Sequence, residues 1–250
     1  MKMIVTDLDC TLLRNDKTIS PYTIDILRRV QQTGVKIAIA TARPKRAATQ
    51  YIRAINADAA ILHNGAVIYT GDTHYNSYTI PNQTGTDILQ HIAARHPNIR
   101  ASVEIDDALY ANFEIDAPGW ENTRTDFTDL PNKPIDKMMF SADDPESIKA
   151  IQAMLHKDFN VILGEGWLLM AMHKNACKYL GVKEVAAKFN ITPADVVAFG
   201  DDTNDVEKLK HCGIGVAVEN AIDAAKAVAD YVCASNEEDG VARWLAERYL

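Results

Sequence analysis

The chain has 250 residues, of which 47% are hydrophobic and 24% are charged, and its formal net charge at pH 7 is −8. This length is sufficient for one or two domains with a substantial buried core. The acidic balance argues against a nucleic acid or an anionic membrane as the main partner. It is compatible with a phosphorylated metabolite, because a bound divalent cation reverses the charge locally.

Two further features concern the cellular location. No apolar run approaches the length of a membrane span, and no signal-peptide pattern precedes the charged Asp7. The cysteines are scattered and form no Cys-x-x-Cys pair: Cys10, Cys177, Cys212 and Cys233. We therefore expect a cytoplasmic protein with no membrane and no nucleic-acid partner. The sequence gives no indication of the oligomeric state.

The N-terminal segment places two carboxylates directly after an apolar run. Residues 3–6 are long enough for one buried strand, and Asp7 and Asp9 follow them. If the backbone stays extended, residues i and i+2 share a face, so the two carboxylates converge just beyond the strand. Paired carboxylates repel unless a cation lies between them or one takes a proton, and Mg²⁺ suits such a site. The alternative is that Asp7 opens a turn and Asp9 is solvated.

Strands and helices alternate in the next part of the chain. Ser20 and Pro21 are typical of a helix start and Gly34 of a helix end, which predicts a helix over residues 21–33. The elements expected after it are a strand over 35–40, a helix over 44–55, a strand over 59–62 and a hairpin from 67 to 80. This order predicts a parallel sheet with helices on both faces.

The alternation changes near Pro81. Helices are expected over residues 83–95 and 145–156, and a loop without periodicity over 117–134. The expected strands cover residues 99–105, 109–114, 137–141, 159–163 and 167–172, the last two joined by a turn at 164–166. Adjacent strands with short links predict an antiparallel sheet with helices on one face. We interpret residues 81–176 as an inserted α+β domain, between core segments 1–80 and 177–250.

The strand and helix alternation then resumes. The expected elements are a helix over residues 178–189, a strand over 195–199, a helix ending near residue 211, strands over 214–218 and 231–233, and a last helix capped by Ser235. The predicted fold class is therefore α/β. It combines a doubly wound, mostly parallel, Rossmann-like core with the inserted α+β domain.

Polar side chains follow the predicted core strands at several places. In an open parallel sheet, the carboxyl ends of the strands line the ligand crevice. We therefore expect Asp7, Asp9, Thr41, Asp201 and Asp205 to meet at one site, although they lie far apart in the sequence.

At these residues the sequence resembles the haloacid dehalogenase (HAD) superfamily of phosphohydrolases, and within it the Cof-type sugar phosphatases with a C2 cap. Four segments carry the resemblance in the family's order: residues 7–13, Thr41-Ala42-Arg43, Lys178 and residues 200–205. Residues 63–66 and 215–221 also resemble stretches of that group. The inserted domain matches only in length and element pattern. The resemblance implies the HAD fold, Mg²⁺ as cofactor, and a C2-type cap that acts as a lid.

The resemblance also implies the catalytic roles. Asp7 would be the nucleophile that forms an aspartyl-phosphate. Asp9 would be the general acid and then the general base, which requires a raised pKa when substrate is bound. Lys178 would neutralise charge on Asp7 and on the phosphate, and Lys174 and Lys183 are the alternatives to it.

The substrate-binding residues implied by the resemblance surround these groups. Thr41 would donate its hydroxyl to the phosphoryl group or cap the following helix, and both roles are compatible. Ala42, Asn64 and Asn204 are the other candidates, and Asn204 would orient either the phosphate or Lys178.

The metal ligands implied are Asp7, Asp9, Asp201 and Asp205, the last as a direct ligand or as an outer-shell partner. We expect Thr11 to support the geometry of the aspartates rather than to touch the substrate.

The expected function is a Mg²⁺-dependent phosphatase that hydrolyses a small phosphorylated metabolite, such as a sugar phosphate. The candidates for specificity are the polar turn at residues 104–107 and the loop that contains Trp120 and Arg124. Two alternatives stay open: a phosphomutase of the phosphomannomutase type, and a non-catalytic regulatory module that binds a metal or a phosphate.

Overall fold

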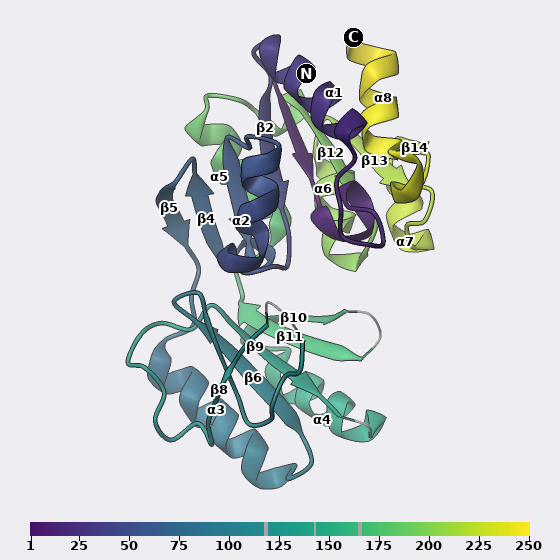
Figure 1. Cartoon of the computed structure of the whole chain (residues 1–250). Coiled ribbons are helices and arrows are strands. Elements are labelled where there is room, and N and C mark those ends of the chain that lie inside the picture. The colour runs from purple at the N-terminus through teal and green to yellow at the C-terminus, as the bar shows by residue number, and fades with distance from the viewer. Residues whose placement is uncertain (118–119, 143, 165–166) are drawn as a thin grey trace. The chain divides into compact units, whose positions relative to one another are not determined.

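Two β-sheets organise the chain (Figure 1). The structure is a computed structural model that describes residues 1–117, 120–142, 144–164 and 167–250. The chain divides into two compact units, the first made of Met1–Arg43, Ala48–Asn76 and Cys177–Leu250, and the second of Pro44–Ala47 and Ser77–Ala176. The sequence predicts boundaries after residues 80 and 176, and the units change after residues 76 and 176.

The first unit contains an eight-stranded sheet in the order β14-β13-β12-β1-β2-β3-β4-β5. The strands from β14 to β3 are parallel, and β4 is antiparallel to β3. The strands are β1 (Met3–Thr6), β2 (Lys36–Ala40), β3 (Ala59–Leu62), β4 (Val67–Thr70), β5 (Thr73–Ser77), β12 (Val196–Gly200), β13 (Ile214–Val218) and β14 (Tyr231–Cys233). The strand order changes direction between β1 and β12, which is where open α/β sheets bind ligands.

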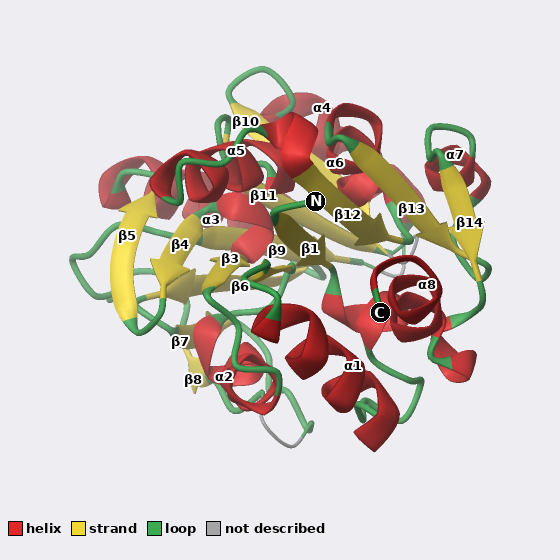
Figure 2. Cartoon of the chain, turned by 90° about the horizontal axis from the view of Figure 1, so that it is seen from above, coloured by secondary structure: helices red, strands yellow, loops and turns green. Residues whose placement is uncertain are grey.

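Helices cover both faces of this sheet (Figure 2). They are α1 (Pro21–Gln32), α2 (Lys45–Ala54), α5 (Lys178–Lys188), α6 (Val206–His211), α7 (Asp223–Lys226) and α8 (Gly240–Tyr249). Helices α1, α2 and α8 lie on one face, and α5 and α6 lie on the other. The doubly wound, mostly parallel α/β core predicted from the sequence is thus confirmed.

Local sequence signals account for these elements. Ser20 precedes α1 and its hydroxyl accepts the N–H of Thr23 at 3.0 Å, with Pro21 as the first helical residue. Gly34 follows the helix with a φ of +90°, a conformation that favours glycine. The central strands β1 and β12 are buried along their whole length, which explains their continuous apolar sequences.

The second unit contains a six-stranded sheet in the order β10-β11-β9-β6-β7-β8. Its strands are β6 (Arg100–Ile105), β7 (Ala108–Ala111), β8 (Thr123–Arg124), β9 (Lys137–Ser141), β10 (Phe159–Gly164) and β11 (Leu168–His173), and its helices are α3 (Asn82–Arg95) and α4 (Pro145–Leu155). All pairs are antiparallel except β7 with β8, which is parallel. A separate hydrophobic core, containing Phe127 and Phe140, holds this unit together.

The structure differs from the predicted elements in a few places. The short strand β8 lies within the loop predicted over residues 117–134, and the short helix α7 was missed. Ser235 precedes a single 3₁₀ turn, and α8 begins only at Gly240, because Asp239 has a left-handed conformation that interrupts the helix. Residues 118–119 of the predicted loop, and residues 165–166 of the predicted turn at 164–166, lie outside the described residues.

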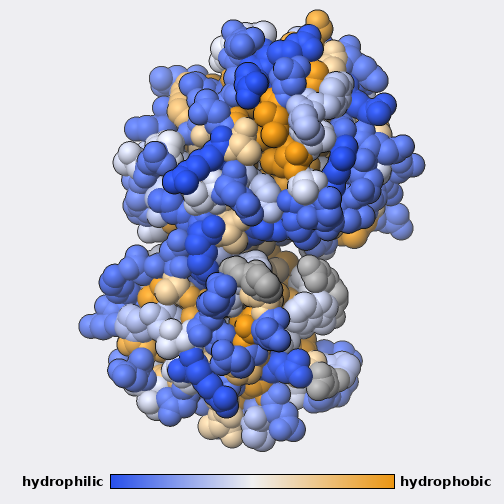
Figure 3. All heavy atoms as spheres, viewed as in Figure 1, coloured by the Kyte–Doolittle hydropathy of each residue, from blue (hydrophilic) through white to orange (hydrophobic). Residues whose placement is uncertain are grey.

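The face of the molecule in Figure 3 is mostly hydrophilic, with smaller apolar areas between polar side chains. Among the residues that the structure describes, no helix combines the length and the apolar character that crossing a membrane requires.

Candidate active site

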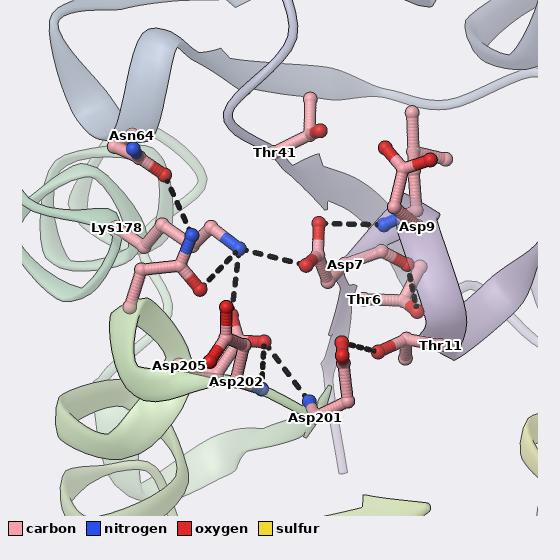
Figure 4. Close-up of polar contacts among 12 residues, drawn as sticks. Thr6, Asp7, Asp9, Thr11, Thr41, Asn64, Lys178, Asp201, Asp202 and Asp205 are labelled. Carbon is pink, nitrogen blue, oxygen red and sulfur yellow. Dashed lines mark hydrogen bonds and ion pairs between the residues drawn. The ribbon is translucent and has the colours of Figure 1, made fainter. Parts of the chain in front are cut away.

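The candidate site lies in the first unit, where β1 and β12 end side by side (Figure 4). Asp7 directly follows β1, and Asp201 directly follows β12. The N–H of Asp7 donates to the carbonyl of Phe199 at 3.2 Å, which fixes the two strand ends to each other. Asp7 and Asp201 therefore lie together at this edge of the sheet, as the sequence predicts.

Asp7 is almost completely buried, and both of its carboxylate oxygens have partners. Oδ1 accepts the N–H of Leu8 at 2.7 Å, and Oδ2 lies 2.8 Å from the ammonium of Lys178. Burial raises the pKa of Asp7, Lys178 opposes this, and the charge of Asp205 adds to the rise, so the pKa lies above its ordinary value. A cation beside this carboxylate would therefore be stabilised.

Lys178 is the lysine that reaches the site, whereas Lys174 and Lys183 are exposed. Its side chain is 1% exposed, and Nζ lies 2.8 Å from both Asp7 Oδ2 and Asp205 Oδ1. Burial lowers the pKa of Lys178, but the charges of Asp205 and Asp7 outweigh that effect and raise it. Lys178 is therefore a buried ammonium shared between two carboxylates.

The start of α5, which carries Lys178, packs closely against the turn between β3 and β4. A Cβ on Gly65 in that turn would lie 2.4 Å from the carbonyl oxygen of Cys177, and Gly65 has a φ of +101°. Glycine at this position therefore allows the close approach that brings Lys178 to the strand ends.

Asp205 is fully buried and accepts four donors. Oδ1 receives Lys178 at 2.8 Å and Lys208 at 2.7 Å, and Oδ2 receives the N–H groups of Asp201 at 3.0 Å and Asp202 at 3.3 Å. Burial raises the pKa of Asp205, but Lys178 and Lys208 outweigh this and lower it. Since an ionised carboxylate offers about four lone-pair sites, Asp205 has little capacity left for a metal ion.

Asp201 is held by Thr11, whose hydroxyl donates to Oδ1 at 2.6 Å. No hydrogen bond to the other oxygen, Oδ2, is found within the described part of the chain. Burial and the charges of Asp7 and Asp205 raise the pKa of Asp201, although the hydrogen bond from Thr11 opposes this.

Three carboxylates of the site could hold a metal ion, because oxygens of Asp7, Asp201 and Asp205 lie within 4.8 Å of one another. Among the described residues, the buried ammonium groups that pair with these carboxylates are those of Lys178 and Lys208, so one negative charge is unbalanced when all three carboxylates are ionised. Burial, followed by the charges of neighbouring carboxylates, raises the pKa values of Asp7 and Asp201, so a cation beside them would be stabilised. A hard divalent cation such as Mg²⁺ suits this donor set.

The side chain of Asp9 lies outside this cluster, so its expected role as a carboxylate metal ligand needs correction. Arg43 binds it through Nε and Nη2, both at 2.7 Å, and Lys17 Nζ lies 2.9 Å away. The strand ends at Thr6, and the chain enters a tight turn at Leu8, so the alternation of an extended chain does not apply. Figure 4 shows the Asp9 carboxylate without a link to Lys178 or Asp205.

The raised pKa expected for Asp9 concerns the substrate-bound state, whereas this structure shows the substrate-free state. Burial raises the pKa of Asp9, but the hydrogen bonds and charges of Arg43 and Lys17 outweigh this and lower it. In this substrate-free conformation Asp9 is therefore an ionised carboxylate paired with two cations.

The candidate substrate-binding residues surround the same strand ends. Thr41 is buried after β2, and its hydroxyl accepts the N–H of Arg43 at 3.2 Å. This bond closes the turn before α2 rather than capping that helix, which begins at Lys45. Ala42 lies in the same turn.

A chain of amide hydrogen bonds leads from Asn64 to Lys178. Asn64, in the turn after β3, accepts Asn204 Nδ2 at 3.0 Å, and Asn204 Oδ1 accepts Lys178 Nζ at 3.1 Å. Of the two roles expected for Asn204, the structure shows the contact with Lys178. Asn64 is fully buried and acts on the site through Asn204.

Sequence reasoning missed three cations of this region: Lys17, Arg43 and Lys208. Arg43 belongs to the segment Thr41-Ala42-Arg43, which carries the family resemblance. The sequence did not indicate that its partner is Asp9. Lys208 lies three residues after Asp205, a spacing that brings side chains together on a helix. Lys17 has no comparable signal in the sequence.

Similarity to known proteins extends over almost the whole chain. The family model of haloacid dehalogenase-like hydrolases matches residues 4–245. Over 264 residues, the chain is 29% identical to a Bacillus subtilis (strain 168) protein named 5-amino-6-(5-phospho-D-ribitylamino)uracil phosphatase YitU, covering 99% of the chain and 97% of that protein.

Solved structures show the same fold over the whole chain. A haloacid dehalogenase-like hydrolase from B. subtilis matches with a TM-score of 0.89 and 22% identity, covering 100% of both chains. A sugar phosphatase of HAD subclass IIB matches with a TM-score of 0.86 and 24% identity, covering 99% of this chain and 98% of that one.

Proposed function

The chain belongs to the haloacid dehalogenase-like hydrolases and is a phosphatase, and we propose that it hydrolyses the phosphate monoester of a small metabolite with Mg²⁺ and a covalent aspartyl-phosphate on Asp7. The observation that carries this proposal is the arrangement of Asp7. It is a buried carboxylate at a strand end, 2.8 Å from the ammonium of Lys178 and grouped with Asp201 and Asp205.

In the first half of the reaction, an oxygen of Asp7 attacks phosphorus and the bond from phosphorus to the leaving oxygen breaks. Lys178 stabilises the negative charge shared by Asp7 and the phosphoryl group. Its position is set by Asp205 and Asn204, so no rearrangement of the lysine is needed at the moment of reaction. The hydroxyl of Thr41 is the proposed donor to a phosphoryl oxygen.

Asp9 is the proposed proton carrier. The leaving oxygen takes a proton from Asp9, and in the second half a water molecule gives a proton to Asp9 as it attacks the aspartyl-phosphate. Inorganic phosphate is released and the Asp7 carboxylate is restored. Because Asp9 is ionised and paired with Arg43 and Lys17 in the free protein, it must leave these partners and take up a proton from solvent before it can protonate the leaving oxygen.

Asp7 and Asp201 are the proposed direct ligands of Mg²⁺, and Asp205 is an outer partner because its lone pairs are taken by four donors. When bound, the ion offsets the charge that develops on the phosphoryl group. Asp201 has an oxygen available for this role, and Thr11 orients the carboxylate through the other oxygen.

A sugar phosphate or a related small phosphate monoester is the proposed substrate class. The support is the similarity to the named B. subtilis phosphatase and the fold shared with a sugar phosphatase. Of the specificity candidates, Glu104 is fully buried within the second unit, whereas Arg124 is exposed in β8. A panel of phosphorylated metabolites, compared by kcat/KM, would identify the substrate.

The decisive test is Asp7→Asn with a generic aryl phosphate, p-nitrophenyl phosphate. The amide cannot attack phosphorus, so we expect hydrolysis to fall below detection while the circular dichroism spectrum is unchanged. Asp72→Asn, an exposed aspartate in the turn after β4, is the matched control and should keep full activity.

Full activity of Asp7→Asn would reject the proposed nucleophile, and absence of turnover in the wild type with Mg²⁺ would favour a non-catalytic module. Phosphoryl transfer to a second sugar hydroxyl, in place of phosphate release, would identify a mutase.

A further inference from the structure

A second buried lysine, Lys208, lies behind the residues to which the proposed reaction assigns roles. It belongs to α6, and its side chain is completely buried. A buried ammonium is rare because it loses its hydration, so a lysine in such a place needs charged or hydrogen-bonding partners. The partners of Lys208 are the residues that position the proposed nucleophile and its lysine.

Two contacts of Lys208 lead toward Asp7, one through Asp205 and Lys178 and the other through the carbonyl of Phe199. Its Nζ lies 2.7 Å from Asp205 Oδ1, the oxygen that also binds Lys178 at 2.8 Å. Its Nζ also donates to the carbonyl of Phe199, which accepts the N–H of Asp7. Lys208 thus contacts the partner of Lys178 on one side and the backbone partner of Asp7 on the other.

The backbone makes room for this arrangement at Gly200, the last residue of β12. A Cβ on Gly200 would lie 2.5 Å from Asp205 Cβ and 2.6 Å from Lys208 Nζ. Any side chain there would displace either the carboxylate or the ammonium. The close packing of Asp205 and Lys208 therefore depends on glycine at this position.

We propose that Lys208 is a positioning residue of the phosphatase site, which shares Asp205 with Lys178 and so keeps the Lys178 ammonium on the nucleophile Asp7. This inference rests on the proposed function. With one cationic partner instead of two, Asp205 would attract Lys178 more strongly, and Lys178 would move away from Asp7. Lys208 also supplies one of the two positive charges that oppose the three carboxylates.

A purely structural role for Lys208 explains the burial less well. In a protein core, a buried ion pair is often no more stabilising than well-packed apolar residues of similar volume. An apolar side chain in α6 would fill the same space without the loss of hydration. We therefore infer that the contribution of Lys208 to the site is its positive charge.

Two variants distinguish the effect of the Lys208 charge from the effects of its side-chain shape and of its hydrogen bond to Phe199. Lys208→Met removes the charge and keeps the length, while Lys208→Gln is neutral but can still donate to the Phe199 carbonyl. Lys210→Met is the matched control, because Lys210 is exposed on the same helix. Turnover of p-nitrophenyl phosphate, Mg²⁺ binding by thermal shift and inorganic phosphate binding by calorimetry would be measured for each.

We expect kcat to fall by roughly 10- to 100-fold in both Lys208 variants, because small misplacement of a charged group at a reacting centre has effects of this size. Loss of a positive charge should also tighten Mg²⁺ binding and weaken binding of inorganic phosphate, each by roughly tenfold. These opposite changes distinguish charge from structural damage, which would weaken the binding of both ions. A crystal structure of Lys208→Met should show a longer distance from Lys178 Nζ to Asp7 Oδ2.

Wild-type kcat in the Lys208→Gln variant, or weaker binding of both ions, would overturn the proposal. Failure of both variants to fold would also overturn it, since Lys208 would then act only in the core. An inactive wild-type protein would instead refute the proposed phosphatase function. In that case the Mg²⁺ and phosphate measurements and the distance from Lys178 to Asp7 still decide the role of Lys208.

Discussion

At the scale of residues, the candidate site is a buried cluster in which ammonium groups partly balance the charges of three carboxylates. Asp7, Asp201 and Asp205 lie together and share the ammonium groups of Lys178 and Lys208. Both ammonium groups contact Asp205 and lower its pKa despite its burial, whereas burial and the neighbouring carboxylates raise the pKa values of Asp7 and Asp201. The carboxylates left short of positive charge are those that we propose as metal ligands.

Asp136, a buried carboxyl group of the second unit, provides a prediction about pH. Burial and the charge of Glu104 raise the pKa of Asp136 to about 7, compared with 3.8 for an exposed aspartate. Between these values the folded protein keeps a proton that the unfolded chain has lost, so this residue makes stability fall as pH rises from about 4 to about 7.

Asp136→Asn should remove this loss, because an amide does not ionise. Relative to the wild type, the variant should gain on the order of 2 kcal/mol of unfolding free energy between pH 4.5 and pH 8. Urea unfolding at both pH values measures this gain, and Asp129→Asn, an exposed position in the same unit, is the control. Equal pH dependence in the wild type and in Asp136→Asn would contradict the assignment.

At the scale of elements, the site depends on how closely three segments approach one another. The turn after β3 touches the start of α5 at Gly65, and the end of β12 touches Asp205 and Lys208 at Gly200. Helix α5 carries Lys178 at its first position, so any displacement of this helix start also moves the ammonium. Short connections and glycines, rather than long side chains, thus determine the spacing of the reacting groups.

Gly65→Ala tests this dependence. An added Cβ would meet the Cys177 carbonyl oxygen at 2.4 Å, and the φ of +101° is unfavourable for alanine. We expect a loss of about 3 kcal/mol of stability together with reduced kcat, because α5 must shift. Gly34→Ala is the control for backbone strain alone, since Gly34 has a φ of +90° and no atom within 4 Å of its Cβ position.

The Gly34→Ala control should lose only about 1 kcal/mol and keep its kcat, because Gly34 lies at the end of α1. Thermal unfolding and p-nitrophenyl phosphate turnover would be measured for both variants. If Gly65→Ala lost no more stability than Gly34→Ala, the close contact with Cys177 would not be important.

At the scale of the whole molecule, the site joins segments from both ends of the chain. Asp7 directly follows the first strand, Asn64 lies in the turn after β3, and Lys178 and Asp201 belong to the last third of the sequence. The parallel sheet order β12-β1-β2-β3 brings these segments to one edge. A ligand bound by Asp7 and Asp201 therefore links both core segments and should stabilise the folded unit.

Mg²⁺ should accordingly raise the thermal stability of the protein, and removal with EDTA should reverse the change. At a concentration 100-fold above the dissociation constant, the expected gain is about 2.7 kcal/mol. Asp201→Asn should abolish most of this gain, while Asp72→Asn should keep it. A thermal shift with Mg²⁺ that is the same in Asp201→Asn and in the wild type would exclude Asp201 as a ligand.

The sequence by itself determined the fold class, the succession of core strands and helices along the chain, and the gathering of Asp7 with Asp201. Apolar runs, helix caps and the alternation of elements are local signals, and a parallel sheet then brings strand ends together. The family resemblance favoured Lys178 over Lys174 and Lys183, and the tertiary structure places its ammonium beside Asp7. Only the tertiary structure showed that the side chain of Asp9 lies outside the cluster of Asp7, Asp201 and Asp205. It also revealed that Lys208 pairs with Asp205 and that Arg43 pairs with Asp9. The contacts of Lys178 with Asp7 and of Arg43 with Asp9 depend on the turn after Asp7 and on the packing of α5. Such partners lie far apart in the sequence and leave no local pattern, because three-dimensional packing brings them together.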